Sequence, residues 1–554
     1  MKRNYPILLL LVAVLALLTL GLGGQRVIAY TVKGETDAQA VASGTNYTNT
    51  VALFDDTTVH SIQLIISDAD YESMITTYRE TSEKDYFHAD VIIDGVRVND
   101  VGVRLKGNAS LMTAVGGKMG MGGMNIHIDA GAEMPNFPEG MQPPEGMQLP
   151  EGMQPPAGMQ LPGAGDTQTT PSAQTTPVAG EPQATPGANA GNRPARPGGQ
   201  GFQPGGQPGG NAAAGAETLT DGVSSGDTKI PLLIKFDEYV SGQTYQGYTK
   251  LAIRTYGANN NAAMLQEPVT NAMARLVGMP VTDTAYTGFK LNDGAETLYS
   301  ISNVIDENYL AQYFTDATGV MYKSEVGATL QYQGEDPTQY TSSFSQETRL
   351  NDADYAPLIA FMKFLDESDD AAFEAELPNY LDVDSFATYL ALNNLLVNTD
   401  SLVGMGNNYY LYYDETIGRF TLLMWDANES LGKLAMGGAS ASYDIYYAGA
   451  SSGGPMMRGG TNVLFTRFMA NATFKALYEQ KLVEIYQAVY ASGAIKAQIE
   501  QYAAVVRPAV EARGLASLDA YDAAVANLLD FVSQRGAYLS TTTLLGDVLG
   551  NLDN

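Results

Sequence analysis

The chain has 554 residues and carries 61 acidic against 31 basic side chains, a formal net charge of −30 at pH 7. This excess of carboxylates argues against nucleic acid as a partner, because nucleic-acid binding needs clustered Lys and Arg. There is no cysteine, so disulfides, thiolate nucleophiles and cysteine-ligated zinc are excluded together. The three histidines, His60, His88 and His127, form no metal-like pair, and we interpret each as structural or surface. Chemistry therefore falls to carboxylates, amides, hydroxyls, Lys or Arg, helped by a hard metal that prefers oxygen ligands.

The N-terminal segment predicts export. Lys2 and Arg3 precede an apolar run over residues 5–24, as basic residues precede the hydrophobic stretch of an export signal. The run is long enough to span a bilayer, so residues 1–28 are predicted to be either a cleaved signal peptide or a retained membrane anchor. The small and polar residues 29–50 indicate a tether. We therefore expect the remaining chain to be extracytoplasmic, either secreted or anchored to the outer face of the cytoplasmic membrane.

Residues 51–130 are predicted to be β-rich. The segment SIQLIISDADYESMI, from Ser61, indicates a strand followed by an Asp-capped helix. Apolar and polar residues then alternate on both sides of Asp94-Gly95, which is typical of a β-hairpin. MNIHID, from Met124, indicates one more strand.

Residues 131–227 are predicted to be a disordered Pro/Gly/Met-rich insertion. Four hexads, EGMQPP, EGMQLP, EGMQPP and AGMQLP, run from Glu139 to Pro162, and a stretch of Thr, Pro, Gly and Ala follows. Such a composition leaves too little apolar surface to offset the entropy of ordering the chain. We interpret the insertion as a flexible spacer, with copper(I) binding by its methionines as the alternative.

Residues 228–320 are predicted to continue the β-rich part, and residues 321–545 to form a mainly helical part. The first region shows strand patterns in IPLLIKFDEYV and YTKLAIRTY, then a helix that ends at Gly278, then a strand–turn–strand pattern in DTAYTGFKLNDGAETLYSISNVID. The apolar face of that helix is formed by Leu265, Val269, Ala272, Met273 and Leu276. A β-rich N-terminal lobe followed by a helical C-terminal lobe is the layout of a protein-kinase-like fold, although other α+β proteins share this order. The predicted fold class is α+β.

The densest chemical signal lies in the stretch NTDSLVGMGNNYYLYYDETIGRFTLLMWDANESLG. A predicted helix over residues 383–397 leads to Asp400, and a hairpin of two strands separates Asn408 from Asp426. The hairpin brings all three side chains to the same end, and phosphoryl transfer needs a carboxylate near the acceptor hydroxyl and an Asp/Asn pair for Mg²⁺. The alternative is that these residues are ordinary turn and cap residues. Trp425, which precedes Asp426, is interpreted as core packing.

Several segments share their residues and their order with a known family. NTD followed by NNYYLYYD, GRF and WDANESLG resembles the pattern N-x-D, N-Y-x-L-Y and W-D of the CotH kinases. VGVRLKGNAS resembles the family's V-G-x-R-x-K-G-x-S segment, and KIPLLIKFDEYVSGQTYQGYTKLAIR resembles its Phe-Asp strand and the strand after it. MLQEPVTNAMARLVGMPV resembles its R-E-P helix, and MYKSE resembles its Y-K strand. The chain thus resembles the CotH (spore-coat-protein-H-like) atypical protein kinases over about residues 62–490, apart from the insertion.

The resemblance implies a kinase that uses ATP with Mg²⁺ or Mn²⁺. Carried over by position, Asp400 resembles the catalytic aspartate of the family. Asn408 and Asp426 resemble its metal-binding residues. The implied acceptor is a Ser or Thr hydroxyl of an extracytoplasmic or cell-surface protein.

The resemblance also implies a set of residues that bind the nucleotide. Glu267 takes the place of the helix glutamate that pairs with a basic residue on the phosphates. That basic residue is open between Arg254 and Lys323. Lys106, from VGVRLKGNAS, completes the set, and the turn at 107–110 either covers phosphates with its backbone N–H groups or is an ordinary hairpin turn.

Three departures from the family pattern leave a second function open. Asn428 replaces the second acidic residue of W-D-x-D, Asn303 replaces a glutamate, and Thr297 replaces the glycine of G-x-Y. The alternative is a catalytically weak or inactive kinase-fold protein that binds at the cell surface. A glycosidase with paired carboxylates is more distant, since a single Trp leaves few platforms for sugar rings.

Overall fold

The structure is a computed structural model, and it describes residues 44–107, 111, 114–121, 124–128, 229–255, 262–325, 328–404, 406–433, 441–447 and 462–550. The predicted signal or anchor (1–28), the tether up to residue 43, the insertion (131–227) and residues 108–110 of the turn after Lys106 lie outside the described residues. Among the residues that are described, no helix has the length and apolar character needed to cross a membrane.

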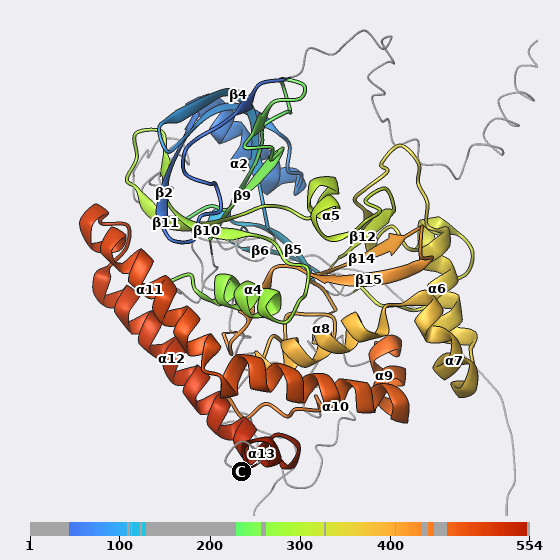
Figure 1. Ribbon diagram of the computed structural model, residues 1–554. Helices are drawn as coiled ribbons and strands as arrows, with labels where there is room; N and C mark the ends of the chain where they lie inside the picture. Colours follow the sequence, from blue (N-terminus) through green and yellow to red (C-terminus); the bar gives the residue numbers. More distant parts are fainter. Residues whose placement is uncertain are drawn as a thin grey trace, which may run out of the picture.

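The fold is mixed α+β, which confirms the predicted class. Most strands lie in the first half of the chain, and most helices follow in the second half (Figure 1). The sequence did not predict that seven of the strands close into a barrel, in the order β10-β11-β9-β7-β4-β3-β2. The barrel strands are β2 (Val59–Ile66), β3 (Phe87–Ile93), β4 (Val96–Leu105), β7 (Leu232–Lys235), β9 (Lys250–Arg254), β10 (Thr284–Leu291) and β11 (Thr297–Ser302).

The barrel combines strands from both sides of the insertion. The predicted hairpin is confirmed as β3 and β4, joined by Asp94 and Gly95, whose φ angles of 47° and 83° suit a tight two-residue turn. At the end of β4, Leu105 pairs with Leu232 of β7, so the chain returns to the same sheet after the insertion. Parallel pairing of β2 with β10 closes the barrel around a core of aliphatic side chains.

A separate four-stranded sheet, in the order β13-β12-β14-β15, lies beside the helical part (Figure 1). Its strands are β12 (Val320–Ser324), β13 (Phe344–Gln346), β14 (Tyr409–Asp414) and β15 (Arg419–Met424). Two short sheets complete the described strands: β1 (Asn46–Tyr47) with β8 (Thr244–Tyr245), and β5 (Gly117–Met121) with β6 (Met124–Ile128). Strand β6 is the one predicted from MNIHID.

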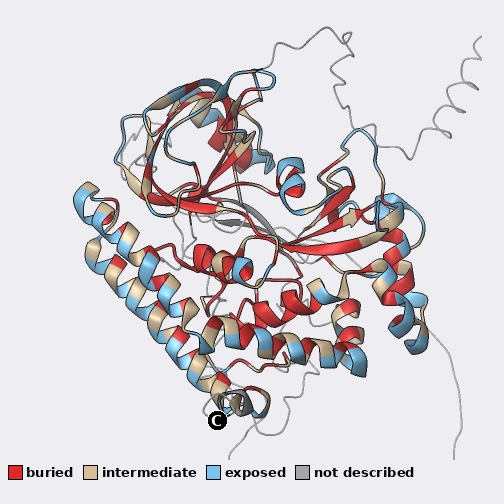
Figure 2. Cartoon of the chain, viewed as in Figure 1, coloured by how far each residue is buried: buried red, intermediate tan, exposed pale blue. Residues whose placement is uncertain are grey.

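In the helical part, helix α8 (Val383–Leu395) is largely buried. Every residue from Phe386 to Leu395 is buried, and α8 is mostly red beyond its first turn in Figure 2, whereas α11 and α12 keep exposed faces. The other helices are α2 (Asp68–Thr81), α4 (Gln266–Leu276), α5 (Glu307–Tyr313), α6 (Ala356–Glu367), α7 (Asp370–Tyr380), α9 (Val463–Ala470), α10 (Ala472–Tyr486), α11 (Ala494–Arg513), α12 (Leu518–Thr541) and α13 (Thr543–Gly550). Short turns of helix occur at η1 (Pro337–Gln339), η2 (Ala427–Glu429) and η5 (Gln487–Ala491).

Two local predictions were wrong in detail. Helix α2 is capped by Ser67, whose hydroxyl accepts a hydrogen bond from the Asp70 N–H, and not by an aspartate. In α4, Val269 and Met273 are buried as predicted, but Leu276 is 52% exposed, because the last turn of the helix leaves the core.

Candidate functional site

The hairpin of β14 and β15 brings Asp400, Asn408 and Asp426 together at one end. The Asn408 amide nitrogen donates to Asp400 Oδ2 at 2.8 Å and to the Asp400 carbonyl at 3.1 Å. It also lies 3.5 Å from the carbonyl oxygen of Asp426. Asn408 and Asp426 both have left-handed backbones, with φ angles of 58° and 52°, which Asn and Asp tolerate better than other side chains. The three residues that the sequence predicted to lie together are therefore in contact, through the side chain of Asn408.

A buried arginine connects this hairpin to the barrel and to α4. Arg254 ends strand β9, and Glu267 lies in the first turn of α4. Arg254 Nε is 2.7 Å from Glu267 Oε2, and Arg254 Nη2 forms an ion pair with Asp426 Oδ1. The side chains of Arg254 and Glu267 are only 5% and 1% exposed, and that of Asp426 is 26% exposed. Of the two basic residues left open by the sequence, Arg254 is the one beside Glu267.

The pKa values of the two carboxyls that contact Arg254 shift in opposite directions. Burial raises the pKa of Glu267, and the attraction of Arg254 only partly offsets this effect. Burial would also raise the pKa of Asp426, but Arg254, Lys106 and Lys433 together hold it below its ordinary value. Asp426 is therefore a charged carboxylate in the described state.

Asp400 experiences a different environment. Burial raises the pKa of its carboxyl to about 6, and the nearby negative charges of Asp426 and Glu429 add to the effect. Hydrogen bonds from Asn407 and Asn408 act in the opposite direction. A carboxyl with this pKa is mostly ionised at pH 7 and can still accept a proton, which is the property of a general base.

Lys106 and Lys323 lie at the edge of this cluster. The Lys106 ammonium lies 4.6 Å from the centre of the Trp425 ring, and burial lowers its pKa to about 7. Lys323, on β12, forms its ion pair within the described part of the chain with Glu325, at 3.3 Å, whereas the partner of Glu267 is Arg254. Lys84, which the sequence analysis missed, donates to the carbonyl of Gly107 at 2.6 Å, next to Lys106.

Comparison with protein families agrees with the sequence motifs. The family model described as "CotH kinase protein" matches residues 220–539, more than half of the chain. The chain belongs to the CotH kinase family. This confirms the family predicted from the motifs. Comparison with curated proteins found no match.

One solved structure similar to this CotH family member is the crystal structure of a Helicobacter pylori proinflammatory kinase, CtkA. The two share 11% sequence identity, with a TM-score of 0.26. The match covers 55% of this chain and 92% of the Helicobacter chain.

Other residues of the CotH motif WDANES form a second link to α4, which the sequence analysis missed. The hydroxyls of Ser430 and Thr270 are hydrogen-bonded at 2.6 Å, and both are buried. Glu429 forms an ion pair with Lys433 at 2.9 Å. Helix α4 is thus attached to the segment after β15 through both Glu267 and Thr270. The available signal was the occurrence of Glu and Ser three and four residues after the motif aspartate.

The donor chemistry of the site fits a hard cation. No group of three or more His, Cys, Asp or Glu that could hold a metal occurs among the residues whose placement is described. A kinase site does not need one, because Asp, Asn and nucleotide phosphates share the coordination. Asp426 supplies a carboxylate that stays charged, and Asn408 supplies an amide, and oxygen donors of this kind suit Mg²⁺.

The three departures from the CotH pattern do not share one location. Asn303 is buried, and its side-chain oxygen accepts from the Asp283 N–H at 2.8 Å, so it has a structural partner. Thr297 begins β11. Asn428 lies in η2, two residues after Asp426, and is the only one of the three on the motif loop itself.

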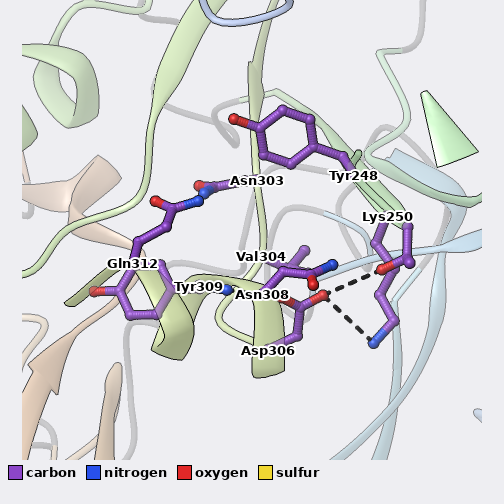
Figure 3. A pocket seen from close by; sticks show the side chains of 9 residues that line it. Tyr248, Lys250, Asn303, Val304, Asp306, Asn308, Tyr309 and Gln312 are labelled. Carbon is purple, nitrogen blue, oxygen red and sulfur yellow. Dashed lines mark hydrogen bonds and ion pairs between the residues drawn. The ribbon is translucent and has the colours of Figure 1, made fainter. Parts of the chain in front are cut away.

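A small pocket beside α5 is a poor candidate for the nucleotide site. Figure 3 shows Tyr248, Lys250, Asn303 and Asp306 around it, with Asp306 joined to Lys250 at 4.0 Å. Its volume of about 10 Å³ holds about one water molecule. The Asp400–Asp426 hairpin is therefore the better candidate for chemistry.

Proposed function

We propose that this CotH family member is an exported kinase that transfers the γ-phosphate of ATP to Ser or Thr of extracytoplasmic proteins. The barrel with α4 would act as the N-terminal lobe and the helical part as the C-terminal lobe of a kinase-like fold. One observation carries the proposal: Asp400, Asn408 and Asp426 meet at one end of a hairpin whose last aspartate contacts the buried Arg254–Glu267 pair.

The roles follow from the charges. Asp400 accepts the hydrogen bond of the acceptor hydroxyl and takes its proton as the oxygen bonds to the γ-phosphorus; its pKa of about 6 leaves it ionised at neutral pH. The bond from the γ-phosphorus to the bridging oxygen breaks, and ADP leaves. Asn408 and Asp426 would hold Mg²⁺ or Mn²⁺, which when bound neutralises charge on the phosphates. Arg254, oriented by Glu267, and Lys106 supply positive charge toward the phosphates.

The location of the reaction belongs to the same proposal. The basic residues and the apolar run over 5–24 support export, either with cleavage or with anchoring in the membrane. An acceptor protein outside the cytoplasm follows from that placement.

The second candidate is a weak or inactive kinase-fold binding protein. Asn428 favours it, because an amide beside Asp426 provides less negative charge for a metal than the usual carboxylate.

Incubation of the purified chain with γ-labelled ATP and either Mg²⁺ or Mn²⁺ tests the proposal. Incorporation of label into the chain or into an added Ser/Thr protein that requires the metal supports a kinase. Nucleotide binding without transfer to any acceptor supports the second candidate. Failure to bind nucleotide with either metal rejects both the kinase assignment and the roles given above.

A further inference from the structure

The single tryptophan of the chain faces two cations of the proposed nucleotide site. The Lys106 ammonium is 4.6 Å and the Arg254 guanidinium carbon 5.3 Å from the centre of the Trp425 ring. Both distances fall within the range in which the negative face of an aromatic ring attracts a cation, and Trp attracts cations most strongly. The ring is 6% exposed, so the attraction is only weakly screened by water.

Trp425 is also close in the chain to Asp426, the carboxylate that attracts these cations. It directly precedes Asp426, and its backbone N–H donates to the Asn408 carbonyl at 3.1 Å. Its other neighbours form a small apolar cluster that includes Leu423 and Tyr410, whose ring meets the indole edge-on at 6.0 Å. Trp425 therefore packs against apolar side chains, as predicted, and its ring also lies beside two cations.

Lys106 makes fewer direct contacts with carboxylates than Arg254 does. Asp426 and Glu267 attract the Lys106 ammonium electrostatically, but within the described part of the chain it forms no ion pair with either, whereas Arg254 forms ion pairs with both. Arg254 and Lys106 repel each other, and this repulsion disfavours two cations at one site. The Asp426 carboxylate attracts both cations, and the indole is an uncharged group whose ring lies beside both of them.

We propose that Trp425 is a positioning residue that holds Lys106 and Arg254 at the distance from Asp426 needed to receive the phosphates of a nucleotide. This inference rests on the proposed kinase function. It gives the tryptophan of the W-D motif a role through its ring face, beyond filling space. Without the ring, Lys106 loses its fixed position, and phosphate affinity falls while adenosine affinity does not.

The test compares ATP and adenosine binding by calorimetric titration, with Mg²⁺, for the wild type, Trp425→Phe and Trp425→Leu. We expect ATP affinity to fall on the order of 10-fold in Trp425→Leu and less in Trp425→Phe, which keeps a weaker π face. Adenosine affinity should stay within about 2-fold, if the ring acts only on groups that receive phosphates. Leu423→Ala is the matched control, because it removes apolar packing from the same cluster without touching either cation. It should lower the melting temperature and leave ATP affinity unchanged.

A double-mutant cycle makes the inference specific. If Trp425 acts largely through Lys106, adding Trp425→Leu to Lys106→Met should lower ATP affinity much less than it does in the wild type. Full additivity, wild-type ATP affinity in Trp425→Leu, or equal losses of ATP and adenosine would each overturn the inference. Should Trp425→Leu fail to fold, Trp425→Phe with Lys106→Met supplies the same cycle. Absence of ATP binding by the wild type would instead reject the proposed function.

Discussion

Replacing Asp400 by Asn should make the protein more stable at neutral pH. The pKa of Asp400 is about 6 in the folded protein, about 2 above its ordinary value of 3.8, so keeping this carboxylate ionised in the folded state costs free energy. At about 1.36 kcal/mol per unit this is about 3 kcal/mol, and because Asp400 is partly exposed we reduce the expected gain to about 1–2 kcal/mol. The amide of Asn removes the charge and keeps an oxygen for the Asn408 hydrogen bond.

The pH dependence gives this prediction its sign. Between about pH 4 and 6 the folded protein holds a proton on Asp400 that the unfolded chain has already released, so the wild type loses stability as pH rises through that window. Asp400→Asn does not lose stability in this window, because it has no carboxyl to ionise. The difference in free energy of unfolding between the variant and the wild type, measured by urea titration, should therefore be largest at pH 7.5 and nearly absent at pH 4.

Asp426→Asn is the matched control, because the neighbouring cations lower the pKa of Asp426 and stabilise its charge. It should cost about 1.5–3 kcal/mol at pH 7.5, the usual size for a hydrogen bond to a charged group. A destabilised Asp400→Asn, or a gain that does not vary with pH, would show that burial does not strain the Asp400 carboxylate.

Three further predictions concern other parts of the structure. Arg254→Met should lower the free energy of unfolding, measured by urea titration, by about 3–5 kcal/mol, since it leaves the carboxyl of Glu267 buried without its cation. The double variant Arg254→Met with Glu267→Gln should recover part of that loss in the same assay. Arg535→Met should cost about 3 kcal/mol by the same assay, because this fully buried guanidinium donates to the Asn394 and Leu395 carbonyls at the end of α8; an unchanged midpoint would refute this. Deleting residues 131–227 with a short Gly/Ser replacement should leave the melting temperature unchanged, and a clear fall would mean that the segment packs on the barrel.

The sequence predicted those features that depend on neighbouring residues. Alternating polarity around Asp94-Gly95 specified the β3–β4 hairpin. The same kind of local signal placed Asn408 before one strand and Asp426 after the next, and the two antiparallel strands then bring them together.

Features that join distant segments were beyond such reasoning. Closure of the barrel by β2 and β10 pairs Ile62 with Phe289, and no local periodicity encodes which strands become partners. The ion pair of Arg254 with Asp426 spans 172 positions, and the sequence motifs left Lys323 as a rival to Arg254 for the basic residue beside Glu267. Tertiary packing decided both.

The most direct test of the central claim is the pair of variants Asp400→Asn and Asp426→Asn, each measured for ATP–Mg²⁺ affinity and for transfer of labelled phosphate. Asp400→Asn should bind the nucleotide within a few-fold of the wild type and transfer phosphate slower by about 10² or more, because only the proton acceptor is lost. Asp426→Asn should lose metal-dependent nucleotide affinity and transfer together, because a charged metal ligand is lost. Transfer by Asp400→Asn at the wild-type rate, or tight metal-dependent ATP binding by Asp426→Asn with none by Asp400→Asn, would contradict the assignment of these two aspartates.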